Sequence, residues 1–460
     1  MHWPNLGELT IRFYSLNLIA NKHAYRRVFS DLIYMPIKIL ASADLHLGKR
    51  TSGIDVFSDD CSTKLTWKRM LDYACRNSVD VVLLAGDVID RNNRYYEASI
   101  ALQEGFARLK DAGIEVFLVS GNHDFDVLPQ VIRNHSFDNV HLLGANGHWE
   151  ISRFERSGEV IQFIGWSFPK QYVTTNPVLQ LGALQTDSNF LRLGVLHTDV
   201  DKVESRYGPV PLLDLQNADI DIWMLGHIHK PSNFAGEKII RYPGSPQSLS
   251  AKESGRHGAL LLTVDQSRVE VEEISFSNCR FEWLNIDVSA VDSQETLRLL
   301  VENDLSLAAN LKLTELGETV FLVYDLHLNG QNRRCREIKA WAEPLKNDYD
   351  MPLATGTRVL VREVSANIRP VIEDHEVLAS ETSPAGLLAQ TILALRNGNS
   401  TPFLEELIRD WERNFRTITN STTYQPLQEQ WQREGNPRIA KVLIEQECNR
   451  LLNELLFPSN

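Results

Sequence analysis

The chain has 460 residues, of which 43% are hydrophobic and 23% charged. These values are typical of a globular protein with several domains, and they exclude a disordered, collagen-like or low-complexity chain. The 47 Lys and Arg residues against 60 Asp and Glu residues give a net charge of −13, so any contact with nucleic acid requires a locally basic surface.

The first 34 residues are difficult to assign to a fold. The stretch 9–20 is too polar for the core of a signal peptide. Met35 directly precedes the first apolar strand. One hypothesis is therefore that Met35 is the true start and that residues 1–34 are an extension outside the fold.

Strands and helices alternate from residue 35 to about residue 278. The expected strands span residues 37–43, 79–85, 114–119, 160–165, 193–196, 220–225 and 259–264, with helices over 64–75 and 96–109. This rhythm is typical of a βαβ sheet with buried strands. We predict a layered α/β domain over residues 35–278.

Two further regions follow this domain. A strand over 281–288, a helix over 294–305 and a strand over 319–328 predict a small α+β domain at residues 279–365. Residues 366–460 are predicted to be helical, because Ser383-Pro384 is a good helix start, Gly398 is a good helix stop, and apolar residues recur at helical spacing after residue 404.

The cysteines indicate the compartment. Cys61, Cys75, Cys279, Cys335 and Cys448 are odd in number, far apart, and contain no CxxC pair. We therefore expect no disulfide framework and no thiolate zinc site, and a reducing, cytoplasmic location. The sequence contains no run of 18 apolar residues, so no membrane span is predicted.

Five short polar motifs follow apolar runs in the first domain. In order they are Asp44-Leu45-His46, Gly86-Asp87-Val88-Ile89-Asp90, Gly121-Asn122-His123-Asp124, His197-Thr198 and Gly226-His227-Ile228-His229. In open α/β sheets, ligands bind at the rim where strands end in loops. Carboxylates, imidazoles and an amide without thiolate suit Mn²⁺, Fe²⁺ or Zn²⁺. The sequence thus predicts a divalent metal site at this rim.

The spacing within the motifs supports this interpretation. Residues two apart at an extended strand end point the same way, as in Asp44-x-His46 and His227-x-His229. A carboxylate such as Asp87 is able to bridge two metal ions, since each oxygen takes one. A single DxH motif is weak, because Asp325-Leu326-His327 occurs within an alternating strand and is expected to be only a solvated strand face. All five motifs in this order are far more specific than any one of them.

The ordered set of motifs resembles the calcineurin-like metallophosphoesterase superfamily. The segment Tyr242-Pro243-Gly244-Ser245-Pro246-Gln247 makes the chain similar to the SbcD-type DNA repair exonucleases, including their YhaO-like relatives. The resemblance is specific over residues 38–264, looser over the α+β domain, and only architectural beyond residue 366. It implies a metallophosphoesterase β-sandwich flanked by helices, with the α+β domain as a capping domain that orients DNA.

The resemblance also implies roles for individual residues. Asp44, His46, Asp87 and His229 would surround one metal ion, and Asp87, Asn122, His197 and His227 the other. The usual metal of the family is Mn²⁺. His123 matches the catalytic histidine, which stabilises the transition state or protonates the leaving oxygen, and Asp124 would orient it. Asp90 would support a ligand rather than act as one.

This assignment implies hydrolysis of a phosphodiester by a two-metal mechanism. Basic and aromatic side chains near the motifs could pair with phosphates and stack on bases. The stronger candidates are Lys49, Arg50, Arg91, Arg94 and Tyr95, and the weaker ones are Arg206, Tyr207, Arg256 and His257. An equally good interpretation is that the stronger candidates are solvated residues at helix starts.

Three functions stay open at this point. The favoured one is a DNA exonuclease or endonuclease in DNA repair, which the family pairs with an SMC-like ATPase of the SbcC type and which is often a homodimer. The apolar helical faces near the C-terminus would then dock the ATPase through Trp411 and Phe415, or simply pack on the protein itself. The alternatives are a phosphodiesterase for small nucleotides and a non-catalytic scaffold, although no predicted ligand is missing.

Overall fold

The computed structural model describes residues 36–456, apart from 55–60, 91–94, 136, 267, 370–374 and 420–436. The predicted extension at 1–34, and the candidate contacts Arg91 and Arg94, lie outside the described residues. Contacts between Cα atoms divide the chain into two compact units. Among the described residues, the first unit comprises those within 36–283, 307–325 and 349–362, and the second comprises those within 284–306, 326–348 and 363–456.

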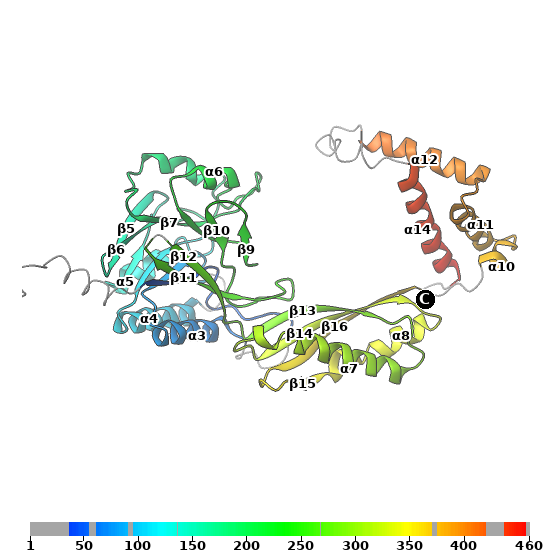
Figure 1. Ribbon diagram of the computed structural model, residues 1–460, viewed down its shortest axis with the longest axis horizontal. Helices are drawn as coiled ribbons and strands as arrows, with labels where there is room; N and C mark the ends of the chain where they lie inside the picture. Colours follow the sequence, from blue (N-terminus) through cyan, green and yellow to red (C-terminus); the bar gives the residue numbers. More distant parts are fainter. Residues whose placement is uncertain are drawn as a thin grey trace, which may run out of the picture. The chain divides into compact units, whose positions relative to one another are not determined.

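Two six-stranded sheets form the body of the first unit (Figure 1). The first sheet has the order β12 (Arg268–Ser275), β11 (Gly258–Asp265), β1 (Ile37–Ser42), β2 (Val81–Ala85), β3 (Glu115–Val119), β4 (Val140–Leu142). The second has the order β5 (Trp149–Arg156), β6 (Glu159–Trp166), β7 (Leu191–His197), β8 (Ile222–Gly226), β10 (Ile239–Tyr242), β9 (Ser232–Phe234). Strands β1 to β4 run parallel, as do β6, β7, β8 and β10.

The sheets pack face to face because alternate residues of each strand are apolar and buried. Ile39 and Ala41 of β1 belong to the same buried cluster as Val195 of β7. The rings of Phe117 and Phe163 stack across the two sheets with centroids 4.1 Å apart. This core joins strands from both sheets and thereby fixes where their ends lie.

Helices cover the outer faces of the sandwich. On the first sheet, Trp67 of α3 and Phe106 of α4 pack with Leu40 and Leu84, which are the outward-facing residues of β1 and β2. The helices on this side are α3 (Thr63–Arg76), α4 (Tyr95–Asp111) and α5 (Leu128–His135), while α6 (Leu212–Asn217) and the 3₁₀ helix η1 (Pro177–Ala183) belong to the side of the second sheet (Figure 1). The predicted layered sandwich flanked by helices is confirmed.

A third sheet has the strand order β13-β14-β16-β15. Its strands are β13 (Cys279–Asp287), β14 (Phe321–Gln331), β16 (Arg358–Arg369) and β15 (Asp350–Pro352), and the associated helices are α7 (Gln294–Asn310), η2 (Leu313–Glu315), α8 (Cys335–Ala342) and α9 (Leu345–Asp348). The small α+β region is therefore present, with β15 and β16 in addition to the two strands that were predicted. The domain boundaries at residues 278 and 365 stay predictions.

The C-terminal region is helical where it is described. It contains α10 (His375–Ala379), α11 (Pro384–Arg396), α12 (Pro402–Thr419) and α14 (Pro437–Leu456). Ser383 caps α11 by accepting a hydrogen bond from the Gly386 amide, and Gly398 follows the helix with φ of +70°. Both predicted boundaries of α11 are confirmed. None of the described helices is long and apolar enough to cross a membrane.

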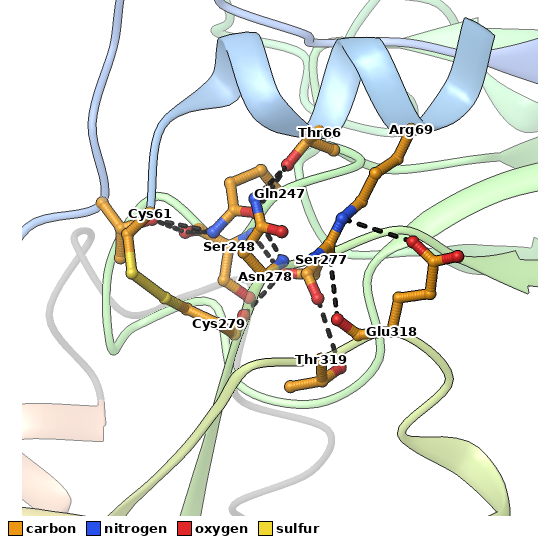
Figure 2. The surroundings of a disulfide bond; sticks show 11 residues. Cys61, Thr66, Arg69, Gln247, Ser248, Ser277, Asn278, Cys279, Glu318 and Thr319 are labelled. Atoms are coloured by element: carbon orange, nitrogen blue, oxygen red, sulfur yellow. Dashed lines mark hydrogen bonds and ion pairs between the residues drawn. A yellow bond between two sulfur atoms is a disulfide. The ribbon is translucent and has the colours of Figure 1, made fainter. Parts of the chain in front are cut away.

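The expectation of no disulfide is wrong. Cys61 and Cys279 are disulfide-bonded, with their Cα atoms 6.2 Å apart (Figure 2). Cys61 directly precedes the N-cap of α3, and Cys279 begins β13, so the pairing depends on the tertiary fold. The two cysteines are 218 residues apart, so their pairing could not be predicted from the sequence. Cys75, Cys335 and Cys448 are free.

We expect loss of this disulfide to destabilise the first unit. A crosslink that closes so long a loop restricts the unfolded chain, and it contributes roughly 2–5 kcal/mol to the free energy of unfolding. Cys279→Ser should therefore lower the urea midpoint measured without reductant, whereas Cys75→Ser should not. Finding five titratable thiols in the unfolded, unreduced protein would contradict the disulfide.

Candidate metal centre

The predicted ligands come together where strands of both sheets end. Asp44 and His46 follow β1, Asp87 follows β2, and Asn122 and His123 follow β3. From the second sheet, His197 is the last residue of β7, and His227 and His229 follow β8. Because the sheets pack face to face, these carboxyl ends meet at one rim of the sandwich.

The backbone at these strand ends is unusual. Asp44, His46, Asp87 and His227 have φ values of +52°, +43°, +50° and +99°. Non-glycine residues rarely adopt this left-handed region, and residues that do so gather at functional sites. The turns point the side chains inward instead of continuing the strands.

One glycine permits close approach at the centre of the site. A Cβ atom on Gly121 would lie 2.2 Å from Asp87 Oδ1, closer than any real contact. The GNHD motif therefore requires glycine at its first position, so that the loop after β3 is able to reach Asp87.

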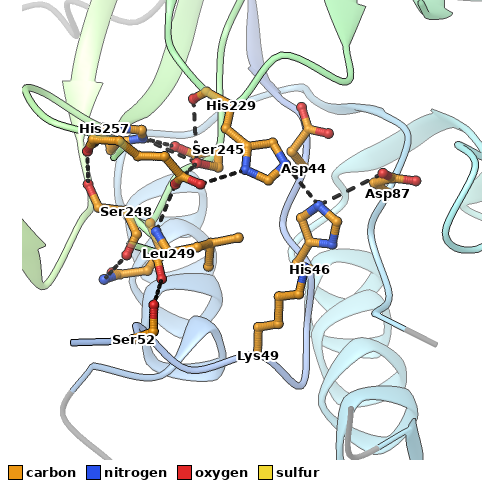
Figure 3. Close-up of polar contacts among 12 residues, drawn as sticks. Asp44, His46, Lys49, Ser52, Asp87, His229, Ser245, Ser248, Leu249 and His257 are labelled. Atoms are coloured by element: carbon orange, nitrogen blue, oxygen red, sulfur yellow. Dashed lines mark hydrogen bonds and ion pairs between the residues drawn. The ribbon is translucent and has the colours of Figure 1, made fainter. Parts of the chain in front are cut away.

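The first ligand cluster comprises Asp44, His46 and His229, whose ligand atoms lie within 4.8 Å of one another (Figure 3). The Nε2 atoms of His46 and His229 are 3.1 Å apart. His229 Nδ1 donates to Glu253 Oε1 at 2.9 Å, and His46 Nδ1 faces Asp90 Oδ2 at 3.5 Å. With each Nδ1 directed at a carboxylate, the two Nε2 atoms present lone pairs to each other. A cation between them would turn this repulsion into coordination.

The second cluster comprises Asp87, His197 and His227. His197 Nδ1 donates to the carbonyl of Ala85 at 3.0 Å, which leaves Nε2 as an acceptor. This Nε2 lies 3.1 Å from Asn122 Oδ1 and 3.3 Å from Asp87 Oδ2. Three acceptors thus face a common point, which only a proton or a metal ion satisfies.

Asp87 lies between the two clusters. Its Oδ2 is 3.8 Å from His46 Nε2 and 3.3 Å from His197 Nε2, and its Oδ1 accepts from the His123 amide. Burial opposes its charge, but the surrounding imidazoles, His197 above all, hold the pKa of Asp87 well below its usual value. Burial favours the neutral form of His197, but the negative charge of Asp87 outweighs this effect and raises the pKa of His197 to about 9. The centre therefore stabilises positive charge strongly, as a pair of divalent ions requires.

His123 lies beside the first cluster. Its ring meets that of His46 edge-on, with centroids 4.9 Å apart. It is half-buried, and burial lowers the pKa of His123 below its ordinary value. A neutral imidazole next to the clusters is available for proton transfer near neutral pH.

The structure corrects the expectation for Asp124. Its Oδ1 accepts from the Gly121 amide at 2.7 Å, and its Oδ2 accepts from the amides of Val88 and Ile89 at 2.7 and 3.3 Å. The carboxylate is thus occupied by backbone donors and joins the loops after β2 and β3, rather than orienting the His123 ring. Burial, together with the charge of Asp87, raises the pKa of Asp124 to about 7.

Two carboxylates at the site were missed by sequence reasoning. Glu253 holds His229, and its other oxygen accepts from the Leu249 amide at 2.8 Å. Asp199 Oδ2 lies 3.4 Å from His227 Nε2. Asp199 stands two residues after His197, a spacing that could have drawn attention to it, whereas no motif surrounds Glu253.

The remaining candidates are placed as follows. Arg50 lines two pockets beside the site, Tyr95 begins α4, and the Tyr207 ring lies 4.6 Å from the His227 ring. His257 is buried and contacts the Ser245 carbonyl at 2.8 Å. The second DxH motif, Asp325-Leu326-His327, serves as a control motif and behaves as expected. Asp325 on β14 pairs with Arg362 and belongs to neither cluster.

Comparison with known proteins agrees with this geometry. Residues 37–231 match the model of the family described as calcineurin-like phosphoesterase. The chain carries a calcineurin-like metallophosphoesterase domain. The predicted resemblance to this superfamily is thereby confirmed.

Several curated relatives are similar to this chain over about half of its length or more. It is 29% identical over 279 residues to the uncharacterized metallophosphoesterase YhaO of Bacillus subtilis, which covers 59% of this chain and 68% of YhaO. It is 28% identical to the DNA double-strand break repair protein Mre11 of Sulfurisphaera tokodaii, with 47% and 55% of the two chains covered. For the SbcD component of the nuclease SbcCD of Escherichia coli the identity is 25%, with 52% and 67% covered. The alignments thus span between half and about two thirds of the relatives.

Among solved structures, a dimetal phosphatase from Danio rerio matches 52% of this chain and 98% of its own. The TM-score is 0.36 and the sequence identity 14%.

Glu253 offers a test of metal binding that does not depend on activity. Loss of a carboxylate that orients a ligating histidine typically weakens metal affinity 10- to 100-fold. Glu253→Gln keeps an oxygen for the Leu249 amide but removes the charge that faces His229. We expect a weaker Mn²⁺ affinity by titration calorimetry, and no change for Glu270→Gln, an exposed glutamate paired with Arg268. An unaltered affinity in Glu253→Gln would contradict the assignment.

Proposed function

We propose that the protein is a Mn²⁺-dependent DNA nuclease that hydrolyses phosphodiester bonds and acts in DNA repair in the cytoplasm. The observation that carries the proposal is the pair of ligand clusters with Asp87 between them and His123 beside them. The similarity to proteins named for double-strand break repair and for SbcCD nuclease activity supports DNA as the substrate.

Seven residues would hold two divalent ions. They are Asp44, His46, Asp87, Asn122, His197, His227 and His229. The ions, when bound, supply a nucleophilic hydroxide at neutral pH and neutralise the charge on the phosphodiester. Glu253, Asp90 and the Ala85 carbonyl fix three of the imidazoles so that their Nε2 atoms face the ions.

His123 would act on the substrate itself. Its ring stands next to His46, with Asp90 in the same group of side chains, whereas the carboxylate of Asp124 accepts from backbone amides. Because burial lowers the pKa of His123, the ring is mostly neutral near neutral pH. It would take up a proton from solvent and then donate that proton to the departing oxygen. Asp124 acts indirectly in this proposal, by holding the loop on which His123 stands.

Partners follow from the same proposal. An SMC-like ATPase of the SbcC type is expected to bind the C-terminal helices, the capping domain is expected to help orient DNA, and a homodimer is an expected assembly. Trp411 and Phe415 of α12 stack with centroids 4.9 Å apart, and both are partly exposed. Together they form an aromatic surface one helical turn long that suits a hydrophobic partner.

Degradation of end-labelled DNA tests the function directly. We expect Mn²⁺ to support cleavage of single- or double-stranded DNA and a chelator to abolish it. Asp87→Ala should lose both cleavage and metal binding, whereas His123→Ala should lose about 10²- to 10⁴-fold in rate while still binding metal. His327→Ala, from the control motif, should resemble the wild type.

The outcomes separate the candidate functions. Intact DNA together with cleavage of cyclic or small nucleotides would replace the nuclease by a small-nucleotide phosphodiesterase. Metal binding without hydrolysis of any ester would indicate a scaffold.

Capture of an SMC-like ATPase of the SbcC type tests the docking surface. We expect Trp411→Asp to reduce capture at least ten-fold, because a charge would be buried against an apolar partner. Exposed Arg413→Asp, on the same helix, serves as the matched control. Equal capture by the wild type and Trp411→Asp would remove Trp411 from the interface.

A further inference from the structure

Two pockets beside the metal centre share one wall, formed by Gly48, Lys49 and Arg50. The larger, of about 500 Å³, is also lined by Ser52, His229, Leu249 and Glu253. It therefore opens directly onto a predicted metal ligand. The smaller, of about 270 Å³, is also lined by Lys64 and Glu97.

The shared wall is rigid. Thr51 donates its amide to the Cys61 carbonyl and its hydroxyl to the Ser248 carbonyl, and the Ser52 amide donates to the Leu249 carbonyl. The Thr63 hydroxyl lies within hydrogen-bond distance of the Lys49 carbonyl, at 3.0 Å. The backbone that carries Lys49 is thus held in place before any ligand arrives, which reduces the entropy lost on binding.

The Lys49 ammonium is also fixed. Its Nζ lies 2.8 Å from Asp90 Oδ2, and the Asp90 side chain is only 1% exposed, whereas that of Lys49 is 28% exposed. The same oxygen of Asp90 also lies 3.5 Å from His46 Nδ1. Lys49 is therefore anchored at its buried side and also lines the pocket.

The acidic lining residue of this pocket is already engaged. Glu253 accepts from His229 through one oxygen and from the Leu249 amide through the other. Both of its carboxylate oxygens are therefore occupied by donors of the protein. An anion that enters the pocket would meet Lys49 and Arg50 on the opposite wall.

We propose that this pocket is a phosphate subsite, in which Lys49 holds the phosphate next to the one at the metal centre. The proposal rests on the proposed function, because only a nucleotide chain places a second phosphodiester beside the first. It assigns oligonucleotides, rather than mononucleotide esters, as the preferred class of substrate. Arg50 flanks the same phosphate, and Asp90 is the positioning residue for Lys49.

Binding of a hydrolysis-resistant oligonucleotide tests the subsite without requiring catalysis. A fluorescein-labelled phosphorothioate oligothymidylate is titrated with the Mn²⁺-loaded protein at several salt concentrations, and anisotropy is read. We expect Lys49→Ala to weaken binding roughly ten-fold, and to reduce the slope of log K against log salt by about 0.7, the contribution of one contact with a single strand. Lys49→Arg should retain the slope.

Two comparisons make the result specific. Lys68→Ala removes an exposed lysine of α3 that lines neither pocket, and it should bind like the wild type. Thymidine 5′-monophosphate, with a single phosphate, should compete for the wild type and for Lys49→Ala with inhibition constants within about three-fold of each other.

Failure of the subsite and failure of the nuclease are distinguishable. An unchanged salt slope in Lys49→Ala, or an equal loss of oligonucleotide and monophosphate binding, would overturn the subsite, since Lys49 would then act only through Asp90 and the metal centre. A changed slope with no DNA cleavage by the wild type would support the subsite while contradicting the nuclease.

Discussion

The predicted metal centre depends on hydrogen-bond acceptors, ring nitrogens and side-chain oxygens, that face one another at short distance. The Nε2 atoms of His46 and His229 are 3.1 Å apart while their Nδ1 atoms face carboxylates. His197 Nε2 also faces the oxygens of Asn122 and Asp87; there, although burial opposes the charge, Asp87 raises the pKa of His197 to about 9, so a proton supplies the positive charge. Buried lone pairs that oppose one another are unfavourable unless a cation or a proton lies between them. The centre thus gathers groups that require positive charge between them, which divalent ions would supply.

The sandwich makes this arrangement possible. The Phe117–Phe163 stack and the apolar cluster between the sheets hold β1, β2 and β3 against β7 and β8, so that five strand ends meet. Left-handed backbone at several ligands then turns their side chains inward, at a cost of about 1–3 kcal/mol each. Such strain persists because buried hydrogen bonds, among them those from the Gly121 and Val88 amides to Asp124, secure the loops.

Much of this could be predicted from the sequence, because periodicity and motif order are local. The strands after residue 35, the cap at Ser383 and the convergence of the ligand residues all follow from patterns within a few residues. Contacts between distant segments that no motif marks could not be predicted. The pairing of Cys61 with Cys279 spans 218 residues, and Glu253 meets His229 only because a loop folds back. Asp124 was expected to orient His123 because the two residues are adjacent in sequence. In the structure, its oxygens accept instead from backbone amides of the loops after β2 and β3.

The charge of the protein bears on how it would select a substrate. A net charge of −13 repels a polyanion over distances shorter than the screening length, so attraction must come from a few cations in fixed positions. Lys49 satisfies this condition, because buried Asp90 anchors its ammonium and the hydrogen-bonded wall anchors its backbone. Flexible surface lysines would lose side-chain entropy on binding a phosphate, whereas a restrained lysine loses less. Discrimination between a nucleotide chain and a small ester would therefore depend on the position of Lys49 relative to the metal ligands, and hardly at all on the total charge.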